Sequence, residues 1–421
     1  MFFFYQIILL TILSISPIII FLRILKKKED KKRFIEKFSF STKNRSTGRL
    51  IWFHGASVGE ILSIIPIIKN YEQNKSIGQI LITSSTLSSS KVLKKFNFKK
   101  TIHQFYPIDY FYFINKFLKY WKPSVAIFID SEIWPNMFYK LEKEKIPLIL
   151  LNARITKKTF HRWIKLKNFS QKIFSKISIA YPQNLESKYF LKKLKTNRIK
   201  HIGNLKFAET DDEKKNIINE NLNLKFKFKK VWIASSTHLS EEIFCAKAHI
   251  ELKKRINNLV TIIIPRHIHR VKKIISEIEK LNLKVTSHSS KLKNIKDTDI
   301  YIVDTFGETK KFHKIGGSVF LGGSIVKRGG QNPLEAARYG AKILHGPNIH
   351  NFKDVYKLLK SLKASKKIST PNELASLITF NKNKDIGIKI RKIGRIVLKK
   401  TIKELDNLIN DEIKKAKILG L

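Results

Sequence analysis

Cysteine is almost absent from the sequence, and this shortage excludes two kinds of site. Cys245 is the only cysteine among 421 residues, so the chain can form neither an internal disulfide nor a multi-cysteine zinc site. A single thiol fits a protein of a reducing compartment. His267 and His269 stand two residues apart without a neighbouring cluster of carboxylates or thiols, and we therefore expect no metal ion there.

Acidic residues are also few, 33 against 83 lysines and arginines, which gives a formal net charge of +50. Such an excess goes beyond what solubility requires and suits three kinds of partner: nucleic acid, an anionic membrane surface or a phosphorylated substrate. No recognisable RNA- or DNA-binding motif accompanies the charge. Lysines are spread along the whole chain, so a compositional bias accounts for part of the excess.

Charged residues are missing altogether from Phe2 to Leu22. This stretch of ~20 residues is about the length of one membrane-spanning helix. It lacks a basic leader and a small-residue cleavage site, so we predict a retained anchor helix over residues 1–25, with a buried or re-entrant helix as the alternative because of Pro17. The basic run from Arg23 to Arg33 predicts that the rest of the chain lies in the cytoplasm, and it can contact anionic head groups.

The remaining sequence, with a hydrophobic share of 43% overall, alternates β-forming runs with helical segments. This alternation predicts two α/β domains with parallel sheets, over residues 35–210 and 216–395, joined by a polar linker near Thr210 to Lys215. A Lys-rich amphipathic helix over 396–421 would end the chain, and such a segment often packs back on the first domain. The predicted strands are Arg49–His54, Gln79–Thr83, Val125–Ile129, Pro147–Leu151, Val231–Ala234, Leu259–Ile264, Ile300–Val303, Val319–Leu321 and Lys342–Leu344.

A glycine-rich stretch from Gly322 to Ala337 predicts strand, loop and helix. Asn332 suits the helix N-cap, Pro333 the first helical position and Glu335 the third, from which its carboxylate can reach back to the cap. Free amides at such a helix start can hold a phosphate group. An ordinary strand-to-helix turn would show the same spacing.

Ser57 and Glu60 follow the first predicted strand with the spacing of a capping box. Capping alone could explain Glu60. A carboxylate at the carboxyl end of a strand could equally act as a general base.

Several ordered segments resemble the Kdo transferases, which move 3-deoxy-D-manno-octulosonic acid (Kdo) from its CMP ester to lipid A precursors. The resemblance covers roughly Leu50 to Phe352. The chain departs from the family pattern at Asp130, Ser131, Ser240 and Phe306, where the family usually has Glu, Thr, Gly and an apolar residue such as Met. The segments that carry it are His54–Glu60, Asp130–Asn136, Leu151–Arg154, Gly203–Phe207, Ala234–Glu242, Pro265–His267, Asp304–Glu308 and Gly322–Ala337.

The resemblance implies a GT-B fold, in which two Rossmann-like domains face a central cleft behind an N-terminal membrane-anchor helix. It implies an inverting glycosyltransferase of lipopolysaccharide core biosynthesis, with CMP-Kdo as donor, lipid IVA as acceptor, and the anionic inner-membrane surface as a further partner. The residues implied to be catalytic are Glu60, as the general base, Glu132 and Lys206. Lys206 would face the cleft and offset the charge that develops on the phosphate or on the Kdo carboxylate. The residues implied to bind CMP are Pro265, Arg266, Phe306, Gly307, Glu308, Asn332, Pro333, Leu334 and Glu335.

No cofactor or metal is required by this reading. Asp297-Thr298-Asp299 resembles a metal-binding signature, but it precedes a predicted strand, and we interpret it as a turn. The alternative functions are another GT-B transferase of envelope assembly, of the heptosyl or lipid-disaccharide type, a catalytically inactive scaffold, and a membrane-tethered basic protein that binds nucleic acid. The ordered motifs favour the transferase, with no nucleic-acid partner.

Overall fold

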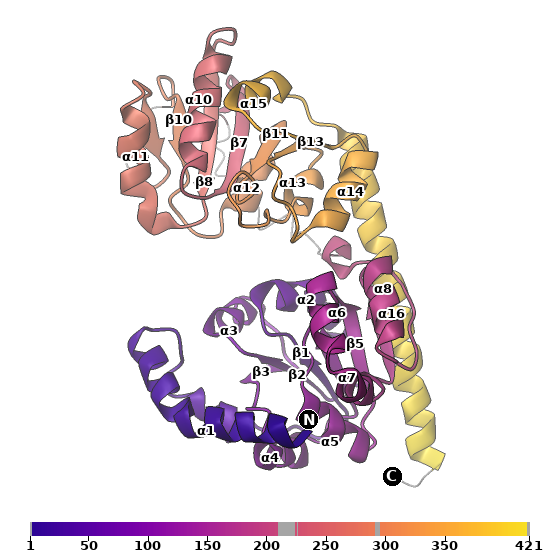
Figure 1. The fold of residues 1–421 in the computed structure, drawn as a ribbon. Helices are drawn as coiled ribbons and strands as arrows, with labels where there is room; N and C mark the ends of the chain where they lie inside the picture. The colour runs from indigo at the N-terminus through magenta and orange to yellow at the C-terminus, as the bar shows by residue number, and fades with distance from the viewer. Residues whose placement is uncertain (1, 209–223, 225, 291–294, 419–421) are drawn as a thin grey trace. The chain divides into compact units, whose positions relative to one another are not determined.

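A computed structural model describes residues 2–208, 224, 226–290 and 295–418 (Figure 1). The chain forms two compact units. The first contains Met1–Thr210 together with Gly394–Leu421, and the second contains Asp211–Ile393. The linker predicted near Thr210 to Lys215 lies outside the described residues.

The first unit is built on a six-stranded parallel sheet with the order β3-β2-β1-β4-β5-β6. Its strands are β1 (Leu50–His54), β2 (Gln79–Ser84), β3 (Thr101–Phe105), β4 (Val125–Ile129), β5 (Leu148–Ala153) and β6 (Ile179–Pro182). Helices alternate with the strands, as parallel connections require. They are α2 (Val58–Glu72), α3 (Leu87–Leu93), α4 (Phe111–Trp121), α5 (Pro135–Lys143), α6 (Lys157–Ile164), α7 (Lys167–Phe174) and α8 (Leu185–Lys193), with the short 3-10 helices η1 (Phe34–Phe38) and η2 (Leu205–Ala208).

The second unit is built on a seven-stranded parallel sheet with the order β13-β12-β11-β7-β8-β10-β9. Its strands are β7 (Lys230–Thr237), β8 (Leu259–Pro265), β9 (Val285–Ser287), β10 (Ile300–Ile302), β11 (Ser318–Leu321), β12 (Lys342–His345) and β13 (Ser365–Lys367). Its helices are α10 (Glu241–Lys253), η4 (Ile268–Arg270), α11 (Val271–Glu279), α12 (Thr309–His313), α13 (Leu334–Ala337), α14 (Lys353–Ser361) and α15 (Pro371–Leu377).

The central strands of both sheets are buried along their length, which explains their nearly continuous apolar sequences. In the first unit, Trp52 and Phe128 on the sheet pack in one cluster with Phe117 and Trp121 of α4 and Phe138 of α5. The α/β fold with two Rossmann-like units is therefore confirmed, and each of the nine predicted strands is present within one to three residues at either end.

Four strands were not predicted, and all four lie at the edges of the sheets. β3 and β6 are the edge strands of the first sheet, and β9 and β13 those of the second. β13 reads Ser-Lys-Lys, and β9 has three half-buried residues. Short polar edge strands are common because they avoid pairing with other chains, but the same property removes their apolar signal.

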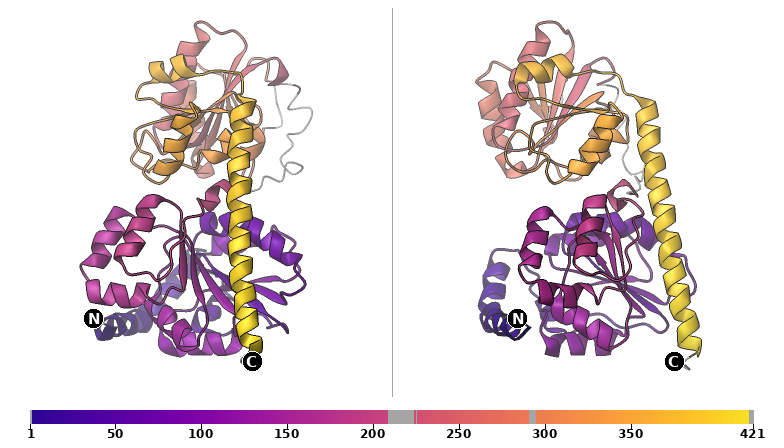
Figure 2. Two further views of the ribbon diagram at one scale, coloured as in Figure 1. Left: turned by 90° about the vertical axis from the view of Figure 1, so that its right-hand side faces the viewer. Right: turned by 45° about the vertical axis from the view of Figure 1, so that its right-hand side comes forward.

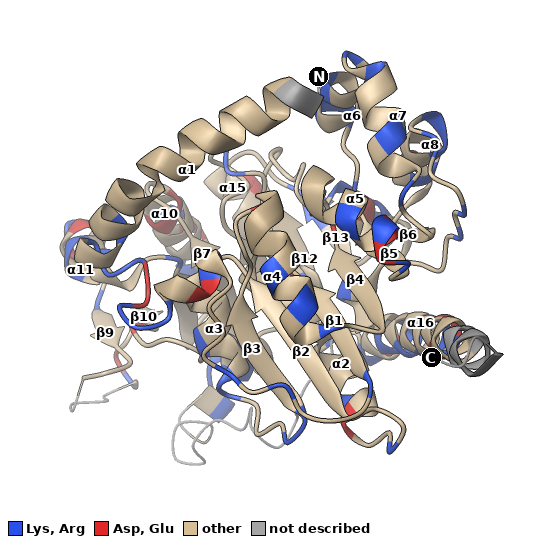
Figure 3. Ribbon diagram, turned by 90° about the horizontal axis from the view of Figure 1, so that it is seen from below, with Lys and Arg blue, Asp and Glu red and all other residues tan. Residues whose placement is uncertain are grey.

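Helix α1 (Phe2–Leu25) is the first element of the first unit and is nearly free of charge, as its tan ribbon shows in Figure 3. Among the described helices, its segment Phe4–Leu25 alone is long and apolar enough to cross a membrane. Its first turns lie next to α4 and α5 (Figure 1). There the hydroxyl of Tyr5 donates to Asp109 Oδ2 at 2.7 Å, and Gln6 Nε2 donates to Asn136 Oδ1 at 2.6 Å.

Large apolar side chains of α1 remain exposed, although its first turns contact the first unit. They are Phe4, Ile7, Ile8, Leu10, Ile12, Ile15, Ile18, Ile19, Phe21, Leu22 and Leu25. Positive charge, by contrast, is distributed over helices and loops of both units (Figure 3).

Helix α16 (Lys384–Ile418) contributes its later residues to the first unit. Both views of Figure 2 show this part of the helix, in yellow, running alongside the first unit. Glu404 accepts hydrogen bonds from Lys200 Nζ at 2.6 Å and from the hydroxyl of Tyr181 at 3.3 Å. At Gly394 the helix approaches the backbone so closely that an added Cβ would lie 1.9 Å from the carbonyl oxygen of Phe207.

We therefore predict that Gly394→Ala destabilises the first unit by about 1–3 kcal/mol, because backbone must move to admit the methyl group. Urea unfolding followed by tryptophan fluorescence measures the change. Gly59→Ala is the control, since no atom lies within 4 Å of its added Cβ, and it should leave stability equal or slightly higher. A Gly394→Ala protein as stable as the wild type would contradict the contact.

Candidate functional site

Glu60 lies at the carboxyl edge of the first sheet, in the first turn of α2. Ser57 caps this helix, and the reciprocal capping box predicted from the sequence is present. The carboxylate of Glu60 accepts hydrogen bonds from the backbone N–H of Ala56 at 2.7 Å and from the hydroxyl of Ser57 at 2.8 Å. The helix cap thus fixes where the carboxylate points.

Glu132 follows β4 at the same edge and is held by two ring nitrogens. His54 Nε2 lies 3.2 Å from Glu132 Oε2, and Trp134 Nε1 donates to the same oxygen at 3.0 Å. His54 is fully buried and stacks on Tyr106, with ring centroids 3.9 Å apart. Burial lowers the pKa of His54, although Glu132 opposes this, so the ring acts here as a rigid polar support.

Asp130 and Lys206 meet beside these groups. Lys206 Nζ lies 3.7 Å from Asp130 Oδ2, and Asp130 is buried. The segment that carries Lys206 is fixed by Asn152, whose Oδ1 accepts a hydrogen bond from Leu205 N at 3.0 Å. Asp130 and Asn152 both adopt left-handed backbone conformations, with φ of 62° and 53°. Such conformations at non-glycine residues gather where a site needs a fixed geometry.

The electrostatics of this edge favour proton transfer by Glu60. Burial raises the pKa of Glu60 to about 7, and the nearby carboxylates of Glu132 and Asp130 add to this effect. The hydrogen bonds from Ser57 and Ala56 oppose it. A carboxylate with a pKa near 7 can accept a proton from a hydroxyl group at neutral pH and pass it on later. The structure therefore brings the predicted residues Glu60, Glu132 and Lys206 to one edge of the sheet.

The second unit presents a cationic edge at the carboxyl ends of β7 and β8. Arg266 follows β8, its backbone N–H donates to the carbonyl of Thr237 at 3.0 Å, and its side chain is exposed. Burial lowers the pKa of His238, and the neighbouring His267, Arg328 and Arg266 act in the same direction. No carboxylate forms an ion pair with Arg266 in the described part of the chain, so its guanidinium can bind an anion.

Pro265 ends β8 beside Arg266, and a further loop of the same edge follows β10. Phe306 is 84% exposed, so its ring is available to a flat ligand. Gly307 has a φ of 87°, and Glu308 is the N-cap residue of α12 with an ion pair to Lys311 at 2.8 Å. Glu308 thus already has a cationic partner.

The glycine loop after β11 differs from the prediction in one respect. Gly323, Gly329 and Gly330 adopt positive φ, as the glycine pairs indicated. The amides of its first part are not free, however. Glu241, fully buried at the start of α10, accepts hydrogen bonds from the backbone N–H groups of His238, Gly323, Ser324, Ile325 and Val326 at 2.7 to 3.4 Å. An internal carboxylate thus binds the amides of the first part of the loop, and these amides are not available to a phosphate group.

The helix after this loop also starts one residue later than predicted. Pro333 is the cap residue of α13, which is a single turn, so Leu334 is its first position and Glu335 its second. Asn332 still contributes to the cap because its Oδ1 accepts a hydrogen bond from Leu334 N at 3.1 Å. A single turn of helix has only a small dipole, so this helix would contribute little to the binding of an anion.

Metal binding has no support among the described residues, where no three His, Cys, Asp or Glu side chains gather closely enough to hold an ion. The predicted turn at 297–299 is confirmed: Asp299 precedes β10 and accepts hydrogen bonds from Lys253 Nζ at 2.6 Å and Lys284 N at 2.9 Å.

Two residues of these edges were not assigned from the sequence. His54 begins the segment that ends in Glu60, and Glu241 lies within the segment that surrounds Ser240. The sequence shows both residues next to assigned ones, which is the signal that could have found them. It does not show their partners, because His54 contacts Glu132 across 78 residues and Glu241 contacts Gly323 across 82.

Ser240, where the family pattern usually has glycine, adopts a left-handed conformation with φ of 76° and caps α10 without a side-chain hydrogen bond. We predict that Ser240→Gly stabilises the second unit by about 0.5–1 kcal/mol, because glycine adopts this conformation without strain. Calorimetry should show a higher melting temperature. Ser240→Ala is the matched control and should leave it unchanged, since it keeps the Cβ. Equal melting temperatures for all three proteins would contradict the strain.

Comparisons with known proteins identify the family of the chain and support its fold. A family model described as 3-Deoxy-D-manno-octulosonic-acid transferase (kdotransferase) matches residues 32–209. The 3-deoxy-D-manno-octulosonic acid transferase of Rickettsia bellii is 35% identical over 372 residues, which cover 88% of each chain. The probable mitochondrial enzyme of the same name from Arabidopsis thaliana is 32% identical, over 87% of this chain and 85% of its own.

Among solved structures, the UDP-N-acetylglucosamine 2-epimerase of Rickettsia bellii covers 86% of this chain and 98% of its own, with a TM-score of 0.52 and 13% identity. At that identity the likeness concerns the fold alone, and it agrees with two Rossmann-like units of the GT-B type. The sequence relatives carry the assignment further, because they match most of both chains. The chain thus belongs to the family of 3-deoxy-D-manno-octulosonic acid (Kdo) transferases, which are glycosyltransferases.

Proposed function

We propose that this transferase moves Kdo from CMP-Kdo to lipid IVA, with inversion at the anomeric carbon, in lipopolysaccharide core biosynthesis. The relatives named as Kdo transferases support the transferred sugar. The single observation that carries the chemistry is Glu60, a half-buried carboxylate whose pKa is raised to about 7 and which is held by its helix cap near Glu132. A competent base of this kind suits attack by a sugar hydroxyl.

In the proposed reaction, Glu60 takes the proton from the primary hydroxyl of the acceptor. The hydroxyl oxygen then bonds to the anomeric carbon of Kdo while the bond from that carbon to the phosphate oxygen of CMP breaks. CMP leaves with the electron pair, and the proton remains on Glu60 until solvent removes it. Glu132 raises the proton affinity of Glu60, and Lys206 limits the total negative charge that this edge must hold.

Binding of CMP is assigned to the second unit. Arg266 would hold the phosphate group, because its guanidinium is exposed and unpaired by any described carboxylate, and it would stabilise the charge that develops on the leaving oxygen. The exposed ring of Phe306 suits stacking on the cytosine. The other residues assigned to CMP lie at the ends of β8, β10 and β11 or in the segments that follow these strands: Pro265, Gly307, Glu308 and Asn332 to Glu335. The proposed reaction uses no metal ion or cofactor.

The acceptor is a phosphorylated lipid, so the enzyme must work at a membrane surface. Helix α1 exposes a long row of apolar side chains and is followed by Lys26, Lys27, Lys28, Lys31 and Lys32. Apolar insertion combined with attraction to anionic head groups is a stable form of attachment. We assign the protein to the cytoplasmic face of the inner membrane on this ground and on the acceptor's chemistry.

The proposal predicts that the wild-type protein adds Kdo to tetraacylated lipid IVA when CMP-Kdo is generated in the same reaction. Glu60→Gln should lower the rate by about 100- to 10,000-fold, because it removes the general base. Mass spectrometry of the lipid product measures both. Glu142→Gln, an exposed glutamate of α5, is the matched control and should remain active.

A measurement of CMP binding distinguishes a wrong acceptor assignment from a wrong donor assignment. Glu60→Gln should bind CMP as the wild type does, with UDP and ADP unable to compete. A folded wild type that binds CMP but yields no product would point to another acceptor. Failure to bind CMP, or preference for UDP or ADP, would contradict CMP-Kdo as the donor. It would support another transferase of envelope assembly.

The raised pKa of Glu60 predicts a pH profile. Its carboxylate is the active form, so kcat/KM should fall about tenfold per unit below pH 7 and level off above it. In Glu132→Gln the loss of a neighbouring negative charge lowers the pKa of Glu60. The midpoint of the profile should then move to lower pH, whatever the residual rate, while Glu142→Gln leaves it in place. An unchanged or higher midpoint in Glu132→Gln would show that the two carboxylates are not coupled.

A further inference from the structure

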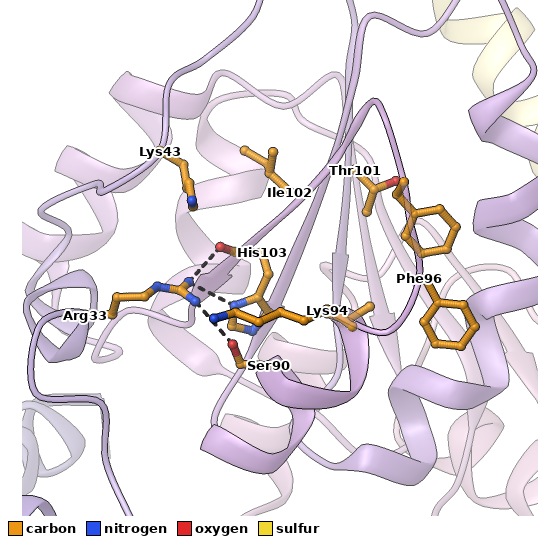
Figure 4. A pocket seen from close by; sticks show the side chains of 10 residues that line it. Arg33, Lys43, Ser90, Lys94, Phe96, Thr101, Ile102 and His103 are labelled. Atoms are coloured by element: carbon orange, nitrogen blue, oxygen red, sulfur yellow. Dashed lines mark hydrogen bonds between the residues drawn. The ribbon is translucent and has the colours of Figure 1, made fainter.

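A second polar site lies in the first unit, away from Glu60 and its neighbours. It is a cavity of about 260 Å³ between the segment that follows α1, helix α3 and strand β3 (Figure 4). Of its lining residues, only Arg33 belongs to the basic run that is expected to contact anionic head groups. Its walls are formed by Arg33, Lys43, Ser90, Leu93, Lys94, Phe96, Phe98, Thr101, Ile102 and His103.

Arg33 is a fixed cation at the base of this cavity. Its guanidinium pairs with the buried Glu36, donating from Nε to Oε1 at 2.8 Å and from an Nη to Oε2 at 2.9 Å. It also donates to the hydroxyl of Ser90 at 3.2 Å and to the carbonyl of His103 at 2.7 Å (Figure 4). The pairing neutralises Glu36, so that carboxylate does not repel an anion in the cavity.

Two further cations line the cavity, and one of them, Lys94, interacts electrostatically with Asp30. Lys43 and Lys94 are exposed at the cavity and form no ion pair in the part of the chain that the structure describes. His103 adds no charge, because burial and the neighbouring Arg33, Lys94 and Lys43 lower its pKa to about 3. Its ring is held by Ser84, whose Oγ lies 2.8 Å from Nε2. The cavity has no acidic lining residue. Asp30 is close enough to Arg33 and Lys94 to interact with them electrostatically, but the three cations of the cavity still outnumber the two nearby carboxylates, Asp30 and Glu36.

The other wall of the cavity is apolar. Phe96 and Phe98 stack with ring centroids 5.5 Å apart and an interplanar angle of 11°, and Leu93 and Ile102 complete the surface. A site for a free inorganic anion needs no such wall. Cations on one side and apolar side chains on the other suit an amphipathic ligand, in which a phosphate group is attached to a hydrocarbon part.

We propose that this cavity binds the phosphate group of a phosphorylated membrane lipid, with Lys43 and Lys94 on the phosphate and the phenylalanine pair against the adjoining hydrocarbon. The inference goes beyond the transfer reaction and does not depend on it, because binding requires neither donor nor turnover.

The surroundings favour a lipid over a soluble ligand. The chain enters the cavity at Arg33 directly from α1, whose apolar side chains are exposed, through a connection that carries five lysines. A membrane that accepts α1 therefore lies within a short stretch of chain from the cavity. Lipid phosphates would reach Lys43 and Lys94 without leaving that surface.

Helix α3 connects this cavity with the proposed catalytic edge. Ser90 contacts Arg33, whereas the adjacent Ser89 donates to the carbonyl of Ala56 at 3.4 Å, and the N–H of Ala56 binds Glu60. A lipid in the cavity would thus contact the same helix that supports the loop of Glu60.

Native mass spectrometry of the full chain in a neutral detergent, titrated with phosphatidic acid, tests the proposal. The wild type should retain one lipid molecule at low lipid concentration. Lys43→Ala/Lys94→Ala should weaken retention at least tenfold, because both exposed cations are removed. Lys119→Ala/Lys143→Ala removes the same charge from α4 and α5 and should bind like the wild type. Equal urea midpoints would show that both double variants are folded.

Binding of other lipids and displacement by competing ligands show which chemical group the cavity recognises. The wild type should bind phosphatidylcholine at least tenfold more weakly than phosphatidic acid. Phe98→Ala should weaken the binding of phosphatidic acid. Displacement by lipid IVA would identify the transferase acceptor as an occupant, and its failure would leave membrane phospholipid. Equal binding of phosphatidylcholine, equal binding by Lys43→Ala/Lys94→Ala, or displacement by inorganic phosphate or CMP at the same concentration would overturn the proposal.

Discussion

Three carboxylates, Glu60, Asp130 and Glu132, share one edge of the first sheet, and their mutual repulsion is the constraint around which this unit is arranged. Each is stabilised differently: Glu60 by its helix cap, Asp130 by Lys206, and Glu132 by two ring nitrogens. The remaining repulsion and burial appear as the raised pKa of Glu60. Because the folded pKa exceeds that of a free glutamate, this group favours folding at acidic pH and loses that contribution as the pH rises through 7. Proton affinity at the site is thus obtained at the expense of stability.

The sheet edge of the second unit has the opposite charge, because cations lie there in place of the three carboxylates of the first unit. Glu241 is buried, yet it remains satisfied by five backbone N–H groups, most of them from the glycine loop. The loop is therefore held from inside the protein and needs no ligand to keep its shape. Arg266, exposed and outside this network, remains for a bound anion. A rigid loop beside a free guanidinium is preorganised, so little ordering is required when the ligand arrives.

The sequence was most informative where a signal is local. Apolar runs such as Val125–Ile129 predict buried parallel strands, and the spacing of Ser57 and Glu60 predicts a capping box, because both depend on neighbours in the chain. The family motifs further led to Glu132, Lys206 and Arg266. The support of Glu132 by His54 and the filling of the glycine loop by Glu241 could not be foreseen, since these contacts join residues that only the fold brings together. Edge strands such as β13 were not predicted because they lack apolar residues.

Helix α1 has the length and composition of a membrane span, but the hydrogen bonds of its first turns set a geometric condition on it. Tyr5 contacts Asp109 and Gln6 contacts Asn136, both in the body of the first unit, while the other end of the helix continues into the same unit. A hydrocarbon core is about 30 Å thick, so a helix that crosses it would carry Tyr5 to the far side. As long as these bonds are made, both ends of α1 lie on one side of the bilayer. Under the proposed membrane attachment, a helix held in this way would lie along the membrane surface and would attach the protein from a single leaflet.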